Sequence, residues 1–403
     1  MSNSDIYDIA VVGAGIVGLT VCALLERQGY RIALIDPMLQ PPPLPEPYDI
    51  RTYALTPASM RLLGQLGVHG ATHASRIADF SGMHVWDADS DGSVRFSAAE
   101  LGRERLGSII EHSNLMGGLH KVIETRPNVT QIVGALEALD QSDIDVCLVL
   151  KTGERLRAAL VLACDGANSP LRKRLRLAEN SRDFTQHALV CNVEVEFGHD
   201  KIARQRFLAS GPLAFLPLPD SHSCAVVWSA TREQAARAAS ATDDAFRNML
   251  GAAFDFALGD VHGSSERLVL PLQTLHANRY AVGRTVLLGD AAHVVHPLAG
   301  QGLNLGLMDA AALGEVLGRR EDSTLRFPTA ALRRFERMRR GENLAMLKLT
   351  EQLNRLFLLE HPLVRRLRGT GMVAVNRIAP IKHWLILRAM GDVGDVPAIA
   401  AIR

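Results

Sequence analysis

The N-terminal part of the chain restricts the possible fold more than any other segment. A strand-like apolar run at residues 9–12 leads into Gly13, Gly15 and Gly18, which are spaced as G-x-G-x-x-G. An amphipathic helical stretch and a second apolar strand follow, and this strand ends at Asp36. Such glycines let a pyrophosphate approach the backbone, and the acid accepts hydrogen bonds from an adenosine ribose. The segment predicts a strand–helix–strand unit that binds a dinucleotide, with FAD or NAD favoured over NADP.

A second glycine-rich segment lies near the other end of the sequence. An apolar strand runs into Gly289 and Asp290, and Gly300-Gln301-Gly302 opens a helix that we expect to begin near Leu303. Glycines at a helix N-terminus expose amide groups, and the helix dipole adds positive potential there. Asp290, at the carboxyl end of a strand, suits a ribityl hydroxyl. This segment therefore predicts a second part of the same cofactor site, which the fold must bring close to the first.

A third motif lies between the other two. Asp165, Gly166, Ser169 and Arg172 fit the pattern D-G-x-x-S-x-x-R, and Pro170 follows the serine. One interpretation is a capped turn, in which the serine accepts a backbone hydrogen bond ahead of a proline at the first helical position. The other interpretation is functional, and the order of the three motifs along the chain favours it.

The composition is that of a soluble globular protein. The chain has 403 residues, of which 47% are hydrophobic and 22% charged, and its net charge is +1. This length predicts two domains, or one large domain with an insertion. The charge does not indicate a nucleic-acid partner. The five cysteines form no C-x-x-C pair, and we expect buried thiols in a reducing compartment and no metal site. We see no signal peptide and no membrane-spanning run, so we expect a cytoplasmic protein.

The order of the predicted elements indicates an α/β fold. We expect a Rossmann-like domain interrupted by a mostly antiparallel sheet, because strand-like runs recur over 187–230 and residues 80–97 alternate as a hairpin does. We predict helices at 107–126 and 328–358. The predicted boundaries are 1–78, 100–182 and 275–325 for the nucleotide-binding domain, 79–99 and 183–274 for the substrate-binding sheet domain, and 326–403 for the C-terminal helical region.

The three motifs together resemble the single-component FAD-dependent aromatic hydroxylases with a p-hydroxybenzoate-hydroxylase-like fold. Segments 107–111, 211–218, 226–229 and 293–304 narrow the resemblance to the hydroxylases of ubiquinone biosynthesis. Segments 82–87 and 186–190 look most like the 2-polyprenylphenol (octaprenylphenol) 5-hydroxylase branch. Relatives usually carry Glu-Asn where this chain has Glu111-His112, so we assign His112 no role.

The resemblance implies a glutathione-reductase-type FAD domain and a role for each motif residue. The three N-terminal glycines would admit the pyrophosphate and Asp36 would hold the adenosine ribose. Arg51 would lie near the FAD phosphates or ribose, the alternative being a solvated loop charge. Asp290 would bind the ribityl chain, and the helix opening at Gly300 would face the flavin pyrimidine edge. The implied cofactor residues are Gly13, Gly15, Gly18, Asp36, Arg51, Asp165, Gly166, Gly289, Asp290, Gly300, Gln301, Gly302, Leu303 and Asn304.

The resemblance also implies a reaction. A flavin C4a-hydroperoxide would hydroxylate the ring of a polyprenylated phenol, with O2 as co-substrate and with NAD(P)H or another donor binding transiently. His296 and Pro297 would lie at the reacting edge, the histidine as a hydrogen-bond partner of the phenol; the alternative is a histidine that locks the loop. Phe215, Pro217 and Trp228 would lie on the sheet over the substrate, or belong simply to the core of that sheet.

The segment from His361 to Gly391 contains no Asp or Glu, and its six basic residues lie among apolar ones. Such a segment suits a surface that touches anionic lipid, here the inner face of the cytoplasmic membrane. The alternative is an ordinary helix pair or an oligomer contact, and we expect a homo-oligomer and contacts with other ubiquinone-biosynthesis proteins. Two other functions stay open: an isoprenoid-acting flavoprotein reductase or oxidase, and a non-catalytic flavoprotein subunit of a ubiquinone-biosynthesis complex.

Overall fold

A parallel sheet begins at the N-terminal strand–helix–strand unit. The protein is represented by a computed structural model that describes residues 6–297, 300–320 and 327–402; Leu298 and Ala299 of the second glycine-rich segment lie outside this part. β1 (Ile6–Val12), α1 (Ile16–Arg27) and β2 (Ile32–Asp36) form the predicted unit. β1 pairs in parallel with β2 and with β11 (Arg155–Ala163), and its centre, Ile9 to Val11, is fully buried. Burial on both sides explains why this strand is continuously apolar.

The first sheet has eight strands, in the order β18-β19-β11-β1-β2-β8, and β10 and β9 extend it from β11. The neighbours β19, β11, β1, β2 and β8 run parallel, whereas β9, β10 and β11 form an antiparallel meander. The strands not yet given are β8 (Val129–Val133), β9 (Leu136–Gln141), β10 (Val146–Leu150), β18 (Ala281–Val282) and β19 (Thr285–Leu287).

The second sheet has nine strands, in the order β20-β17-β12-β15-β14-β13-β5-β6, with β16 also paired to β12. All of its pairings are antiparallel except that of β13 with β5. The predicted fold class, with its mostly antiparallel sheet, is confirmed. Its strands are β5 (Gly82–Asp87), β6 (Ser93–Ser97), β12 (Glu179–Val195), β13 (Ile202–Leu208), β14 (Gly211–Pro217), β15 (Ser223–Thr231), β16 (Val261–Ser264), β17 (Leu268–Ala277) and β20 (His293–Val294).

The prediction of a helix at 107–126 was wrong in its first part. Residues Gly107–Glu111 form the buried strand β7, the middle strand of a three-stranded sheet with β3 (Thr52–Leu55) and β4 (Ile77–Phe80). The helix α4 begins only at His112 and ends at Glu124. The apolar positions of a short buried strand and of a helix turn are alike, and here the strand pairing prevails. The short helices α2 (Pro57–Gln65) and α3 (Val68–Ala71) lie between β3 and β4.

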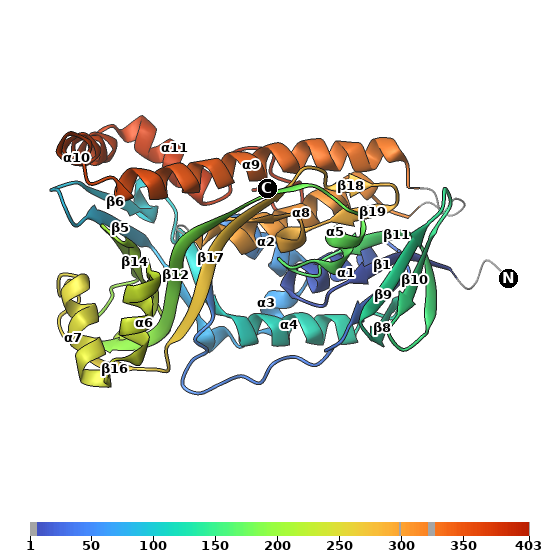
Figure 1. Ribbon diagram of the computed structural model, residues 1–403, viewed down its shortest axis with the longest axis horizontal. Coiled ribbons are helices and arrows are strands. Elements are labelled where there is room, and N and C mark those ends of the chain that lie inside the picture. The colour runs from blue at the N-terminus through green and yellow to red at the C-terminus, as the bar shows by residue number, and fades with distance from the viewer. Residues whose placement is uncertain (1–5, 298–299, 321–326, 403) are drawn as a thin grey trace.

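Helices cover the two sheets and form one long side of the molecule. α6 (Arg232–Ser240) and α7 (Asp243–Ala253) pack on the nine-stranded sheet, and α8 (Gln301–Leu317) packs on α1. The predicted C-terminal helices are α9 (Thr329–Leu358), α10 (Pro362–Arg377) and α11 (Ala379–Ala389), which run along the upper side in Figure 1. The remaining helix is the short α5 (Pro170–Arg174).

A buried ion pair fixes α10 to the nine-stranded sheet. Arg368 Nε lies 2.7 Å from Asp87 Oδ2, and both side chains are almost completely buried. Because an unpaired buried charge is costly, this pair determines which face of α10 points inward. Among the described residues, no helix is both long enough and apolar enough to cross a membrane.

Candidate cofactor site

The three sequence motifs meet at one edge of the parallel sheet. Gly13 follows β1, Asp165 follows the end of β11, and Gly289 follows the end of β19, and these strands are neighbours in the order β19-β11-β1. Backbone bonds extend the pairing into the turns, from Cys164 N to Val12 O at 2.8 Å and from Leu288 N to Ala163 O at 3.0 Å. In parallel sheets the carboxyl edge is where ligands bind.

The glycines of the first turn have two different physical roles. A Cβ on Gly13, whose φ is +108°, would lie 2.3 Å from the carbonyl oxygen of Cys164, and a Cβ on Gly18 would lie 1.9 Å from that of Gly13. These two glycines are required by the protein's own packing. In contrast, a Cβ on Gly15 would meet no atom within 4 Å. Gly15 is the N-cap of α1 and offers no capping side chain, so this open space fits a pyrophosphate.

Asp36 lies beside the first turn, as the ribose role requires. Its Oδ2 accepts a hydrogen bond from Ala14 N at 2.7 Å, and its Oδ1 accepts one from Met38 N at 2.8 Å. Because each carboxylate oxygen can accept a second bond, acceptor positions are left for ribose hydroxyls.

The second motif contains the capped turn that one interpretation of the sequence predicted. Ser169 Oγ accepts the N–H of Arg172 at 3.0 Å, and Pro170 occupies the first position of α5. Asp165 Oδ2 accepts the N–H of Leu171 at 3.0 Å. Its Oδ1 is buried without a partner among the described residues, and burial raises the pKa of this carboxyl. The unpartnered oxygen leaves an acceptor for a ligand hydroxyl, so the capped turn does not exclude a cofactor role.

Arg172 joins the second motif to the third. Its side chain is 2% exposed, and it donates to Ala291 O at 2.8 Å and to Ala167 O at 2.6 Å. It also forms an ion pair with Glu179. The arginine therefore acts through the backbone of the two turns, as a positioning residue.

A buried carboxylate holds the third turn against α8 and α9. Asp309 Oδ2 accepts the N–H of Gly289 at 3.1 Å and lies 2.5 Å from His293 Nε2. Its Oδ1 accepts Arg339 Nε at 2.8 Å and Asn343 Nδ2 at 3.0 Å. Burial alone would raise the pKa of Asp309, but His293 and Arg339 outweigh it and lower the pKa to about 2. Asp309 is therefore ionised at neutral pH. Its contacts with Gly289 and His293 on one side, and with Arg339 and Asn343 on the other, hold the third turn to the two helices.

Sequence reasoning missed Asp309 and Arg339. The available signal was the acid Asp309 next to the apolar run at residues 310–313, since a buried acid needs a partner. The partner comes from another helix, and its position in the sequence gave no indication of the pairing.

Arg51 and Asp290 come from distant parts of the sequence and lie close together. The positive charge of Arg51 acts on the carboxyl of Asp290 and on Tyr53 and His112. The side chain of Asp290 is solvent-accessible, yet the surrounding protein raises its pKa. Both properties follow if the carboxylate lines a cleft. Tyr53 OH lies 3.1 Å from His112 Nδ1, so these two residues, to which the sequence assigned no role, belong to the same group of side chains around Arg51.

The N-terminus of α8 carries amides without a capping side chain. Gly300, the N-cap, has a φ of +59°, and the helix begins at Gln301, two residues earlier than predicted. Asn304 is predicted to contact the cofactor, but both polar atoms of its side chain form their hydrogen bonds with other residues of the protein. Its Oδ1 accepts Thr56 N at 2.9 Å and Ser59 Oγ at 2.7 Å, and its Nδ2 donates to Ala54 O and Gly300 O. An amide side chain has no further capacity, so Asn304 positions the helix.

His296 is fully buried, with 0% of its surface exposed. Neither ring nitrogen has a hydrogen-bond partner among the described residues, and Phe184 contacts the ring edge-on at a centroid distance of 5.1 Å. Burial lowers its pKa to about 4, so the imidazole is neutral at pH 7. Both interpretations of this histidine, as a partner of the phenol and as a residue that locks the loop, stay predictions. Pro297, next to it, is half-buried.

The predicted pocket residues Phe215 and Trp228 pack in the core of the nine-stranded sheet, the alternative that the sequence left open. Phe215 stacks on Phe254 at a centroid distance of 3.8 Å, and with Trp228 it belongs to the cluster beneath α6 and α7. Pro217 alternates onto the same face. Leu216 and Ala225 occupy the opposite face and pack in a cluster that includes Ala54, the neighbour of Gly300.

These features fit one large dinucleotide. Gly15 leaves room for a pyrophosphate, Asp165 Oδ1 is an unpartnered buried acceptor, and α1 and α8 present uncapped N-termini. A family model described as FAD binding domain matches residues 6–324. The chain belongs to the FAD-dependent aromatic hydroxylase family. The predicted resemblance is thus confirmed, with FAD as the cofactor and an aromatic-ring monooxygenase as the enzyme class.

Individual members of the family are similar over nearly their full length. The chain is 32% identical over 391 residues to the 3-demethoxyubiquinol 3-hydroxylase of Escherichia coli, covering 95% of this chain and 98% of that protein. It is 32% identical over 395 residues to the ubiquinone hydroxylase UbiL of Rhodospirillum rubrum, covering 97% and 91%. The crystal structure of p-nitrophenol 4-monooxygenase PnpA from Pseudomonas putida has the same fold, with a TM-score of 0.76 at 19% identity over 97% of this chain and 99% of that one.

The first prediction concerns Gly15. We expect Gly15→Val to abolish FAD binding and to preserve the fold, because the added Cβ meets no protein atom within 4 Å but fills the space for the pyrophosphate. Flavin absorbance per protein and circular dichroism measure the two effects. Gly117→Val is the control, since a Cβ there also meets no atom within 4 Å. A yellow, stoichiometrically loaded Gly15→Val protein would contradict the assignment.

The second prediction concerns the pH dependence of stability. The folded-state pKa of His296, about 4, lies below its ordinary value of 6.5. As the pH falls through this window the unfolded chain binds the proton first, so stability is lost from about pH 6.5 downward and the loss is complete near pH 4. We expect His296→Asn to lose less free energy of unfolding than the wild type between about pH 7 and about pH 4.5.

Urea unfolding at the two pH values measures this difference. His262→Asn, at an exposed position, serves as the control and should keep the wild-type profile. If His296→Asn also keeps that profile, His296 is not a buried neutral histidine.

Proposed function

We propose that this FAD-dependent monooxygenase hydroxylates the aromatic ring of a polyprenylated phenol in ubiquinone biosynthesis. The observation that carries the proposal is the convergence of the three motif turns at one sheet edge, in a chain similar over its length to two ubiquinone hydroxylases. The sequence motifs favour the 5-hydroxylase branch. Because one relative is named a 3-hydroxylase, the ring position and branch stay a prediction.

The FAD would be held by residues of all three turns. Gly15 and the N-terminus of α1 would receive the pyrophosphate, Asp36 the adenosine ribose and Asp290 the ribityl chain, with Arg51 beside it. Asp165 Oδ1 would accept a further hydroxyl. When bound and reduced, FAD supplies the chemistry that activates O2 and transfers one oxygen atom to the ring. The reductant, NAD(P)H or another donor, would bind transiently.

The chain's own groups would orient the reactants and stabilise charge. The N-terminus of α8, which has no capping side chain, would direct the amides of Gln301, Gly302 and Leu303 and the positive end of the helix dipole toward the flavin ring system, where they would stabilise negative charge. His296 is neutral, and neither ring nitrogen has a partner among the described residues, so it would accept the proton of a phenol hydroxyl or donate to its oxygen. Pro297 would fix the backbone beside it.

An apolar wall suits a prenylated ring. Leu216, Ala225 and Phe80 pack in one cluster with Ile386 of α11 and Met390, which follows that helix. This cluster reaches from the Leu216 face of the nine-stranded sheet to the C-terminal helices. We propose that the ring and the first prenyl units lie along it, in place of the Phe215 and Trp228 face. Such a wall would also exclude water from the reaction.

The third prediction identifies the substrate. We expect deletion of the gene to accumulate a prenylated phenol that lacks one ring hydroxyl, detected by mass spectrometry of lipid extracts, and wild-type protein to convert that phenol with one oxygen atom from ¹⁸O2. Gly15→Val should fail to complement, because it loses the cofactor. The mass of the accumulated phenol would also show whether the protein belongs to the 5-hydroxylase branch or is a 3-hydroxylase.

Other outcomes point to the alternatives. Turnover of the phenol without label in the product would indicate a reductase or oxidase. Full complementation by Gly15→Val would indicate a non-catalytic subunit that only stabilises a biosynthetic complex. Absence of any accumulated phenol would contradict the proposed pathway.

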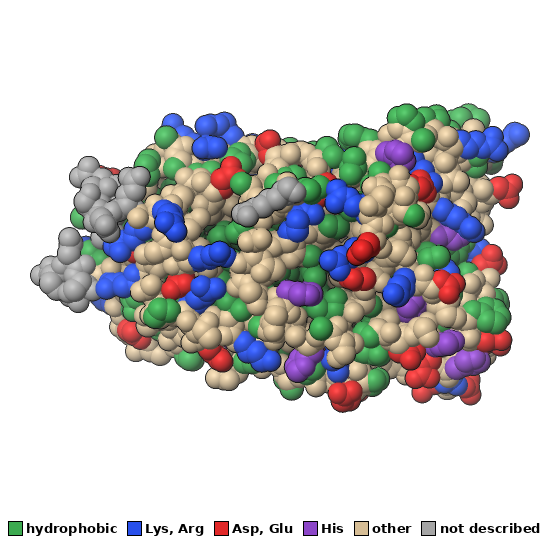
Figure 2. All heavy atoms as spheres, turned by 180° about the vertical axis from the view of Figure 1, so that it is seen from behind, with side chains coloured by type: hydrophobic (Ala, Val, Ile, Leu, Met, Phe, Trp, Pro, Cys, Tyr) green, Lys and Arg blue, Asp and Glu red, His purple; other side chains and the backbone are tan. Residues whose placement is uncertain are grey.

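We also propose that α10 and α11 contact an anionic membrane, where such a substrate dissolves. Leu363, Leu367 and Trp384 are 59%, 63% and 51% exposed, and the exposed Arg366 and Arg377 have no acidic partner among the described residues. Figure 2 shows hydrophobic and basic side chains together at the upper right, the end of the molecule that α10 and α11 occupy. Exposed apolar side chains flanked by cations favour an anionic lipid surface.

The fourth prediction tests this contact. We expect Leu367→Ser with Trp384→Ser to lower the fraction that floats with phosphatidylglycerol vesicles, because it removes apolar anchors on α10 and α11. Ile144→Ser with Phe197→Ser removes side chains that are 66% and 57% exposed elsewhere and should bind as the wild type does. Equal flotation of both variants would remove the membrane proposal, and a changed oligomeric state would assign this face to a second copy.

A further inference from the structure

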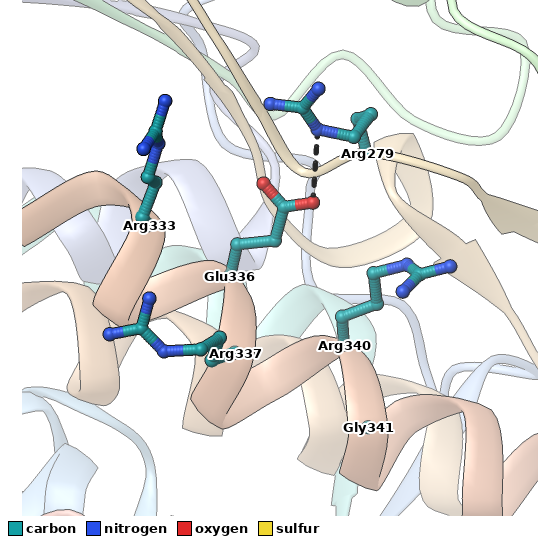
Figure 3. A pocket seen from close by; sticks show the side chains of 6 residues that line it. All are labelled: Arg279, Arg333, Glu336, Arg337, Arg340 and Gly341. Atoms are coloured by element: carbon teal, nitrogen blue, oxygen red, sulfur yellow. Dashed lines mark ion pairs between the residues drawn. The ribbon is translucent and has the colours of Figure 1, made fainter. Parts of the chain in front are cut away.

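An arginine-lined pocket lies on α9, apart from the cofactor cleft and from the α10–α11 face. Its volume is about 530 Å³, and it is lined by Arg279, which follows β17, and by Arg333, Glu336, Arg337, Arg340 and Gly341 of α9. Figure 3 shows Arg279 above Glu336, and it shows Arg333, Arg337 and Arg340 projecting from α9 in different directions. The proposed function does not use any of these side chains.

The positive charge of this pocket is not compensated by the protein. Its one carboxylate, Glu336, forms an ion pair with Arg279 at 3.2 Å. Arg333 and Arg337 have no acidic partner in the described part of the chain. The Nε of Arg340 is buried and has no hydrogen-bond partner there. Buried guanidinium donors are normally satisfied, so the missing partner points to a ligand.

The spacing of these arginines lowers the stability of α9. Arg333 and Arg337 are four residues apart on α9, and Arg340 follows three residues later, so like charges repel along one face. A bound anion would reduce this repulsion.

The geometry indicates the class of anion. Guanidinium groups present planar pairs of donors that match phosphate oxygens. A volume of about 530 Å³ is that of a small-molecule site and exceeds what one phosphate fills. The first exposed large hydrophobic residue along α9 is Leu349, which lies beyond the pocket. The pocket therefore has no apolar side chain on α9 beside it that could anchor it in a bilayer, and a soluble ligand is favoured over a lipid headgroup.

We propose that this pocket binds a soluble ligand that carries a diphosphate and has about the size of a nucleoside diphosphate. The phosphates contact Arg333, Arg337 and Arg340, and Arg279 stays paired with Glu336. The site differs from the dinucleotide site because it lies on α9 and contains no glycine turn of the three motifs. Reduced nicotinamide nucleotides carry this group, and so does ADP.

The fifth prediction tests the pocket on FAD-saturated holoenzyme, so that the dinucleotide site is filled. Isothermal titration with ADP, NADPH and inorganic pyrophosphate should give one saturable site whose affinity falls as salt rises. We expect Arg333→Gln with Arg337→Gln to weaken the binding about tenfold or more, since each removes a charge-assisted contact. Without ligand the variant should melt no lower than the wild type, because like-charge repulsion is reduced.

The matched control is Arg232→Gln with Arg237→Gln, which removes the same charge from two exposed arginines on α6 that form no ion pair with any described residue. This control should bind the three phosphates as the wild type does. The proposal is overturned if the wild type shows no saturable binding of any of the three, or if both variants bind them equally. Binding of phosphatidylglycerol vesicles through these arginines, with no binding of soluble phosphates, would also overturn it. Failure of the proposed hydroxylation would leave these results unchanged.

Discussion

The parallel pairing of β11 with β1 on one side and β19 on the other is the constraint on which the cofactor site depends. This pairing aligns the ends of three strands that are remote in the sequence, so their turns reach the same edge of the sheet. β11 can be paired on both sides because Ala158 to Ala163 are buried, with no polar side chain among them. The hydrophobic effect thus selects the strand, and backbone hydrogen bonds set the register that places the turns.

Buried polar groups then fix the turns within the edge. Asp309 holds the Gly289 turn to α8 and α9, Arg172 joins the turns that follow β11 and β19, and Asn304 fastens α8 to β3. Each of these side chains is saturated or nearly so by protein partners, which separates them from the groups left for a ligand. The unpartnered atoms, such as Asp165 Oδ1 and both nitrogens of His296, lie elsewhere in the same region. Rigid support beside unsatisfied groups is what binding of a large cofactor requires.

Charge on this nearly neutral protein is distributed unevenly. The cleft combines Asp290 with Arg51, the pocket on α9 concentrates arginines, and α10 and α11 carry cations among exposed apolar residues. We propose a different ligand for each surface: a dinucleotide, a soluble phosphate and a lipid layer. The net charge of +1 gave no indication of this separation, because a sum over the chain averages opposite local fields.

The sequence by itself determined the strand–helix–strand unit, the three motifs and the alternation of the antiparallel sheet. These features depend on local rules: Gly13 and Gly18 are needed by the turn itself, and Ser169 and Pro170 start a helix wherever it lies. Only the tertiary structure decided which cluster each side chain of the sheet joins. Phe215 and Leu216 are neighbours in sequence, yet Phe215 packs in the core under α7 and Leu216 packs against the cluster on the opposite face of the sheet. The partners of Asp309, Asn304 and Arg51 are long-range, and such pairings depend on how sheets and helices pack, which no local pattern records.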